Sequence, residues 1–172
     1  MSLIAIRDKA VEIALREVGV KEVGGNNRGP DVEKYLACVG LGPGYAWCAA
    51  FVVWCFREAT LRSADGLMMP LPRTAKVVRL WQRAARHWKS DRPSRGAIYI
   101  HLEDPDDPDS DGHCGIATSW TDRTLSGVEG NTNAAGSRLG NQVRVQLRPL
   151  SYVNAGFVDI GIEGPLDSPL VA

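Results

Sequence analysis

The stretch AWCAAFVVWCF, residues 46–56, is the most apolar run of the chain and determines how the rest is interpreted. It follows a Gly42-Pro43-Gly44 turn, and the residues from Trp47 to Glu58 include no glycine or proline and no charge before Arg57. This pattern predicts a helix that is buried on nearly every side. Because the run is far shorter than the roughly 20 residues that cross a bilayer, it indicates a core helix and no membrane span.

Three more helices are expected in the N-terminal half. Apolar residues recur at helical spacing in residues 3–14, and Gly19 then provides a stop. After a glycine- and asparagine-rich loop, Pro30 opens a short helix that ends near Gly40. A further apolar stripe predicts a helix over residues 74–88.

From Gly96 onward the sequence consists of short runs of residues typical of β-strands. Helices followed by strands predict an α+β fold. We expect one domain over residues 1–172, with a helical half at about 1–90 and a sheet half at about 96–162. An acidic segment, Glu103–Asp111, separates two of the runs and is expected to lie in solvent. The expected strands are Ala97–His101, Cys114–Trp120, Leu125–Glu129, Val143–Leu147 and Tyr152–Ile160.

Charge and cysteine content restrict the possible partners and the cellular setting. Lysine and arginine total 20, as do aspartate and glutamate, so no overall field favours nucleic acid or an anionic membrane. Residues 1–19 are charged throughout and lack the apolar core of a secretory signal. The four cysteines have no zinc-type spacing, so we expect free thiols, no metal and no cofactor. Synthesis in the cytoplasm follows as an expectation.

Cys48 and His113 are the candidate reacting residues. Cys48 is expected where a helix begins, in the positive end of the helix dipole, which lowers the pKa of a thiol and offers N–H groups to an oxyanion. A lone cysteine in an apolar run is more often a core residue. His113 begins a strand at the rim of a sheet, although His87 and His101 compete with it as a base.

Glu129 and Asn131 are candidates for the group that orients the base. They lie two residues apart at the end of a strand, so a regular strand would point both to one face. Either side chain could then accept a hydrogen bond from the second imidazole nitrogen and fix the tautomer. Taken alone, Glu129-Gly130-Asn131 is also a plausible turn.

Four motifs together resemble the CHAP family of cysteine, histidine-dependent amidohydrolases and peptidases, relatives of the NlpC-like hydrolases. The motifs are GGNNRGPDVEKYL at residues 24–36, GYAWCAAFVVWC at 44–55, GHCGIATS at 112–119 and GVEGNTN at 127–133. The resemblance implies a papain-like fold in which N-terminal helices pack on a central antiparallel sheet. It departs from the family at Ala46, where many relatives have proline.

The resemblance also implies roles for individual residues. Cys48 would be the nucleophile and His113 the general base. Glu129 and Asn131 would be polar partners of the imidazole, without a decision on which of them dominates. The calcium site that some CHAP domains hold upstream of the cysteine is not expected, because residues 38–46 contain no acidic side chain.

Three other features lie outside this set of four residues. Trp47, next to the nucleophile, is the one tryptophan expected to contact substrate, although tryptophans at helical spacing are more often core residues. Asp107, Asp109 and Asp111 imitate the start of a calcium loop, yet its twelfth position is Thr118 instead of glutamate. Cys55 and Cys114 are expected in the core.

The candidate residues predict hydrolysis of an amide bond by acyl transfer, and the resemblance to the CHAP family implies that the substrate is bacterial peptidoglycan. The enzyme would be an N-acetylmuramoyl-L-alanine amidase or a stem-peptide or cross-bridge endopeptidase, acting as a phage-type lysin or a secreted antibacterial effector. The alternatives are a cysteine hydrolase of another amide and an inactive wall-binding module. We expect a monomer whose partner is the peptidoglycan stem peptide, with an immunity protein if it is an effector. It would reach the periplasm or cell wall by a non-classical route.

Overall fold

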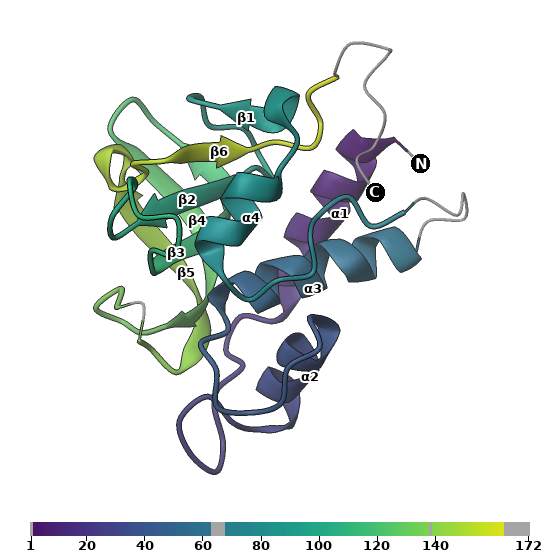
Figure 1. Cartoon of the computed structure of the whole chain (residues 1–172), viewed down its shortest axis with the longest axis vertical. Helices are drawn as coiled ribbons and strands as arrows, with labels where there is room; N and C mark the ends of the chain where they lie inside the picture. The colour runs from purple at the N-terminus through teal and green to yellow at the C-terminus, as the bar shows by residue number, and fades with distance from the viewer. Residues whose placement is uncertain (1, 63–67, 138, 164–172) are drawn as a thin grey trace.

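The computed structural model describes residues 2–62, 68–137 and 139–163. These residues form an antiparallel sheet with helices packed against it (Figure 1). The sheet has six strands in the order β1-β6-β2-β3-β4-β5. The expected α+β class is therefore confirmed. The helices are α1 (Leu3–Arg16), α2 (Pro30–Cys38), α3 (Cys48–Leu61) and α4 (Val77–Arg83). The strands are β1 (Lys89–Ser90), β2 (Ile98–Leu102), β3 (Gly112–Trp120), β4 (Thr124–Thr132), β5 (Gln142–Pro149) and β6 (Gly156–Val158).

Helix α3 is the centre of the helical layer. It lies beside α1 and contacts α2, β3 and β4 (Figure 1). Every residue from Cys48 to Phe56 is buried except Trp54, which is partly exposed. The apolar run therefore forms a helix because all of its sides meet other elements, as its composition predicts. It begins at Cys48, one residue after the expected start.

The two faces of the sheet bury different clusters. Ile98 and Ile100 of β2 face the helices, whereas Tyr99 points to the opposite face. The Tyr99 ring crosses Gly115 of β3 and Gly127 of β4, where an added Cβ would lie 2.3 and 2.5 Å from its nearest atoms. Only glycine permits this approach, and the approach carries the Tyr99 hydroxyl towards the end of β4.

The segment between α1 and α2 covers part of the edge of β5. The Gly19 N–H donates to the Val143 carbonyl at 3.0 Å, and the Val143 N–H donates to the Val20 carbonyl at 2.8 Å. Lys21 then forms a bridge with Gln142. This pairing satisfies backbone groups that an edge strand otherwise exposes, and it fixes the position of the residues that follow.

Two expected elements are shorter than predicted. The helix expected over residues 74–88 is reduced to α4, because Lys76 and Ala84 have extended backbone at its ends; a 3₁₀ turn, Arg86–Trp88, follows. The strand expected over residues 152–160 is reduced to β6, since only those residues find partners in β1 and β2; a 3₁₀ turn, Leu150–Tyr152, comes before it. The two-residue strand β1 was not expected.

No helix in the described ranges is both long and apolar enough to cross a membrane. All four cysteines are buried free thiols, as the sequence predicts.

Candidate active site

Cys48 is the first residue of α3 and lines a surface pocket of about 480 Å³. The pocket is formed by three segments, within residues 39–48, 73–77 and 110–112. The Cys48 side chain is only 4% exposed, yet it is reached from this pocket. The backbone N–H of Ala49, in the first turn of the helix, helps to lower the pKa of the Cys48 thiol. The start of helix α3 thus places the Cys48 sulfur at this surface pocket.

His113 lies near the start of β3 and is fully buried. Its Nε2 donates to Glu129 Oε2 at 2.8 Å. Its Nδ1 is buried and has no hydrogen-bond partner among the described residues. Cys48 raises the pKa of His113, so Nδ1 is the nitrogen that remains to exchange a proton with the Cys48 sulfur. The imidazole therefore lies between a thiol and a carboxylate.

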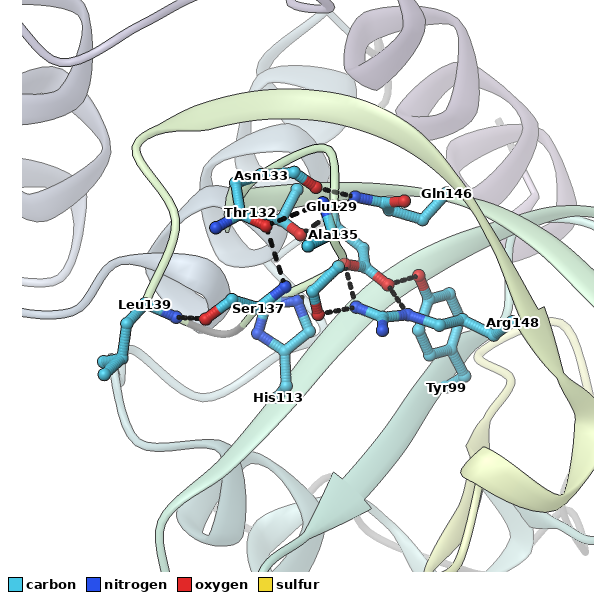
Figure 2. Close-up of polar contacts among 11 residues, drawn as sticks. Tyr99, His113, Glu129, Thr132, Asn133, Ala135, Ser137, Leu139, Gln146 and Arg148 are labelled. Carbon is cyan, nitrogen blue, oxygen red and sulfur yellow. Dashed lines mark hydrogen bonds and ion pairs between the residues drawn. The ribbon is translucent and has the colours of Figure 1, made fainter.

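The Glu129 carboxylate is held by three further contacts. Arg148 of β5 donates from Nε to Oε1 and from Nη2 to Oε2, each at 2.7 Å. The Tyr99 hydroxyl donates to Oε1 at 2.6 Å. Figure 2 shows Arg148 and Tyr99 on one side of this carboxylate and the His113 ring on the other. Glu129 is fully buried, so these donors replace its hydration shell.

The contacts shift two pKa values in opposite directions. For Glu129, burial raises the pKa, but the hydrogen bonds from His113, Arg148 and Tyr99 outweigh burial and lower it to about 2. For His113, burial lowers the pKa, but the hydrogen bonds and charges of Cys48 and Glu129 raise it to about 9. At neutral pH the pair is therefore an imidazolium against a carboxylate.

Cys48 carries the matching negative charge. A hydrogen bond from the Cys114 thiol lowers the pKa of Cys48 most; burial raises it, and His113 lowers it further. The net pKa of Cys48 lies well below its usual value, and that of Cys114 well above. We assign the thiolate to Cys48, because the helix start and His113 favour charge there, whereas the negative charge of Glu129 disfavours it at Cys114.

Asn131 lies in a β-bulge, so strand alternation does not place its side chain. Glu129 is paired with Arg144 and Thr132 with Gln142, which leaves two residues of β4 opposite Val143. Asn131 has a left-handed backbone, with φ 55°, and is buried. The expectation of regular spacing is therefore wrong, and a role for Asn131 beside the imidazole stays a prediction.

Trp47 lies in the core instead of the pocket. Its ring is fully buried and stacks on Tyr35 at 5.5 Å between centroids. Its Nε1–H donates to Glu22 at 2.9 Å, in the segment that covers the β5 edge. The indole has no exposed face for a substrate, so we correct the expected substrate contact of Trp47 to a packing role.

Three residues of the site were missed by sequence reasoning. Tyr99 lies in an expected strand, whereas Arg148 lies one residue beyond the expected strand Val143–Leu147. The contact of each with Glu129 depends on how the strands pair. The glycines at 115 and 127 are the one local signal that a large side chain crosses these strands. Cys114 was assigned to the core, where it is buried, and its hydrogen bond to Cys48 was not anticipated.

The acidic loop between β2 and β3 is attached to α4. Asp109 forms ion pairs with Arg79 at 3.0 Å and Lys76 at 3.7 Å, and Ser110 and Asp111 line the pocket beside Cys48. Across the described parts of the chain, no group of three or more His, Cys, Asp or Glu side chains is arranged to hold a metal. The site therefore offers a thiol and an imidazole, the groups that nucleophilic and acid–base chemistry need.

A cysteine at a helix start, with a buried imidazole that a carboxylate orients, is the arrangement that nucleophilic chemistry by a thiol requires, and the fold around it is papain-like. The model of the CHAP domain matches residues 40–131, and the chain belongs to this family. The match includes Cys48, His113, Glu129 and Asn131, whereas Arg148 lies beyond it. CHAP domains are typically cysteine- and histidine-dependent amidohydrolases.

A solved structure described as the crystal structure of Ly7917 is similar to 88% of this chain, with 15% identity and a TM-score of 0.48. The chain spans 60% of the length of that structure. No curated protein sequence matches this chain.

Proposed function

We propose that the protein hydrolyses amide bonds in the peptide part of bacterial peptidoglycan. The observation that carries the proposal is the arrangement of three side chains, in which His113 lies between Cys48 and Glu129. Cys48 borders a surface pocket, whereas Glu129 is fully buried. Membership of the CHAP family supports peptidoglycan as the substrate.

The geometry supports acyl transfer in two steps. The Cys48 thiolate attacks the amide carbonyl, and the backbone N–H groups at the start of α3 stabilise the oxyanion. The His113 imidazolium gives its Nδ1 proton to the leaving amine, and the amine departs as the thioester remains on Cys48. His113 then takes a proton from water, which hydrolyses the thioester and restores the thiolate.

Digestion of purified peptidoglycan tests the proposal. We expect soluble fragments, and mass spectrometry of their new termini identifies the bond. A free lactyl group on muramic acid with a new L-alanine amine identifies an amidase, whereas new termini inside the stem peptide or cross-bridge identify an endopeptidase. Intact sacculi after incubation with a protein whose Cys48 reacts with iodoacetamide would contradict the proposal and favour another amide as substrate.

We propose further that the protein is made in the cytoplasm, where its thiols stay reduced, and acts in the periplasm or cell wall as a monomer. A phage-type lysin and an injected antibacterial effector both fit, and an effector would require an immunity protein in the producing cell.

Compartment-specific expression tests this delivery hypothesis. In a Gram-negative host we expect cytoplasmic expression to be tolerated and fusion to an export signal to lyse the cells. The same fusion carrying Cys48→Ala is expected to restore growth, which culture turbidity measures. Equal toxicity in both compartments would contradict the hypothesis and point to an intracellular amide.

A further inference from the structure

Arg148 contacts several groups besides the Glu129 carboxylate. Besides its two bonds to Glu129, it donates from Nη2 to the Gly136 carbonyl at 2.8 Å. Its guanidinium lies 4.3 Å from the centre of the Tyr152 ring. An added Cβ at Gly136 would lie 2.6 Å from Arg148 Nη1. The loop after β4 and the turn after β5 thus enclose a planar cation.

The charges of the site balance only when Arg148 is included. Before attack, the site holds a Cys48 thiolate, a His113 imidazolium and the Glu129 carboxylate, which sum to one negative charge. Arg148, with a side chain only 11% exposed, brings the sum to zero. After acyl transfer Cys48 and His113 are neutral, and Arg148 again balances Glu129. The sum is zero in both states, so proton transfer leaves no uncompensated buried charge.

Arg148 also competes with His113 for the same oxygen. Glu129 Oε2 accepts from His113 Nε2 at 2.8 Å and from Arg148 Nη2 at 2.7 Å. A carboxylate oxygen that already accepts from a cation attracts a second donor less strongly. Without Arg148, Glu129 would therefore hold the His113 proton more tightly, and the net negative charge beside Cys48 would disfavour its thiolate.

We propose that Arg148 is a positioning residue of the catalytic site, which neutralises Glu129 and so sets the pH range in which the Cys48 thiolate and His113 imidazolium exist together. The inference rests on the proposed cysteine-hydrolase function. It concerns the reactivity of Cys48, which can be measured without any substrate.

The test follows the pH dependence of Cys48 alkylation by iodoacetamide in the wild type, Arg148→Met and Arg148→Lys. Arg95→Met is the matched control, because Arg95 is an exposed arginine on the same half of the chain. The alkylation rate should rise with pH as Cys48 loses its proton. In Arg148→Met we expect the midpoint of this rise to lie about one pH unit higher than in the wild type, which makes the rate about tenfold lower at pH values below both midpoints. Lysine restores the charge without the two-pronged contact, so its midpoint should lie between the two.

Hydrolysis of peptidoglycan gives the second readout. We expect both limbs of the kcat/KM profile of Arg148→Met to move to higher pH, with kcat lowered about 10- to 100-fold and KM little changed. Alkylation midpoints of both Arg148 variants that coincide with the wild type would overturn the inference and leave Arg148 a structural role only. A wild type that alkylates as expected but digests no peptidoglycan would contradict the proposed substrate and leave the alkylation test intact.

Discussion

Replacement of Cys48 with alanine is expected to reduce peptidoglycan hydrolysis by at least about 10⁴-fold, because the variant has no atom that can form the thioester. The fold should survive. Alanine fits the space of the thiol and suits a helix, so we expect the thermal midpoint to move by no more than about 5 °C. Release of soluble peptidoglycan fragments and thermal unfolding by circular dichroism measure the two effects.

Cys55→Ala is the matched control for this variant. Cys55 lies two turns further along α3 and is fully buried, and burial raises the pKa of its thiol well above the usual value. It should therefore react slowly with iodoacetamide, and its removal should leave the rate of hydrolysis near that of the wild type. A Cys48→Ala variant with wild-type activity beside an inactive Cys55→Ala variant would refute the assignment of the nucleophile.

The central helix could be predicted because its sequence leaves few alternatives. Residues 47–58 contain no breaker and follow a glycine-proline turn, so the start of α3 was predicted to within one residue. That accuracy matters for function, since it placed Cys48 in the first turn. The start of β3 at Gly112 likewise follows the acidic loop, and it places His113 at the rim of the sheet.

The errors arise where the structure depends on contacts between distant segments. The burial of Trp47 depends on Glu22, which the pairing of residues 19–22 with β5 brings to its indole nitrogen. The local sequence around Trp47 carries no sign of that pairing. The regular spacing expected between Glu129 and Asn131 fails because one extra residue in β4 breaks the alternation of a regular strand.

Arg148 could not be found from the sequence for a related reason. Its position in β5 is opposite Leu125, four residues from Glu129, and two long side chains, extended towards each other along the sheet, make the contact. A motif lists neighbours in sequence, whereas this contact is set by the register of β4 against β5. Cys48 and His113, the proposed nucleophile and base, could be recognised from local patterns, whereas Arg148, which contacts Glu129 across the sheet, could not.

Glu129 is expected to stabilise the fold over a defined pH range. Its pKa falls from 4.5 to about 2 in the folded protein, so its contribution is complete above pH 4.5 and is lost as the pH falls towards 2. The pKa of His113 rises from 6.5 to about 9, so its contribution is complete below pH 6.5 and is lost as the pH rises through 9. Both contributions are complete between pH 4.5 and 6.5.

In that window, Glu129→Ala is expected to lower the free energy of unfolding by about 3–5 kcal/mol, because it leaves the Arg148 guanidinium buried without its partner. Urea denaturation at pH 5.5 measures the loss, and the difference from the wild type should shrink at pH 9 and at pH 3. The double variant Glu129→Ala/Arg148→Met removes both charges and fills part of the space with an apolar chain. Replacing a buried ion pair by apolar groups costs much less than removing one partner, so the double variant should recover at least about half of the loss. A double variant as unstable as the sum of the two single variants would show that the two side chains stabilise the fold independently, and that the contact between Glu129 and Arg148 is not the source of the stability.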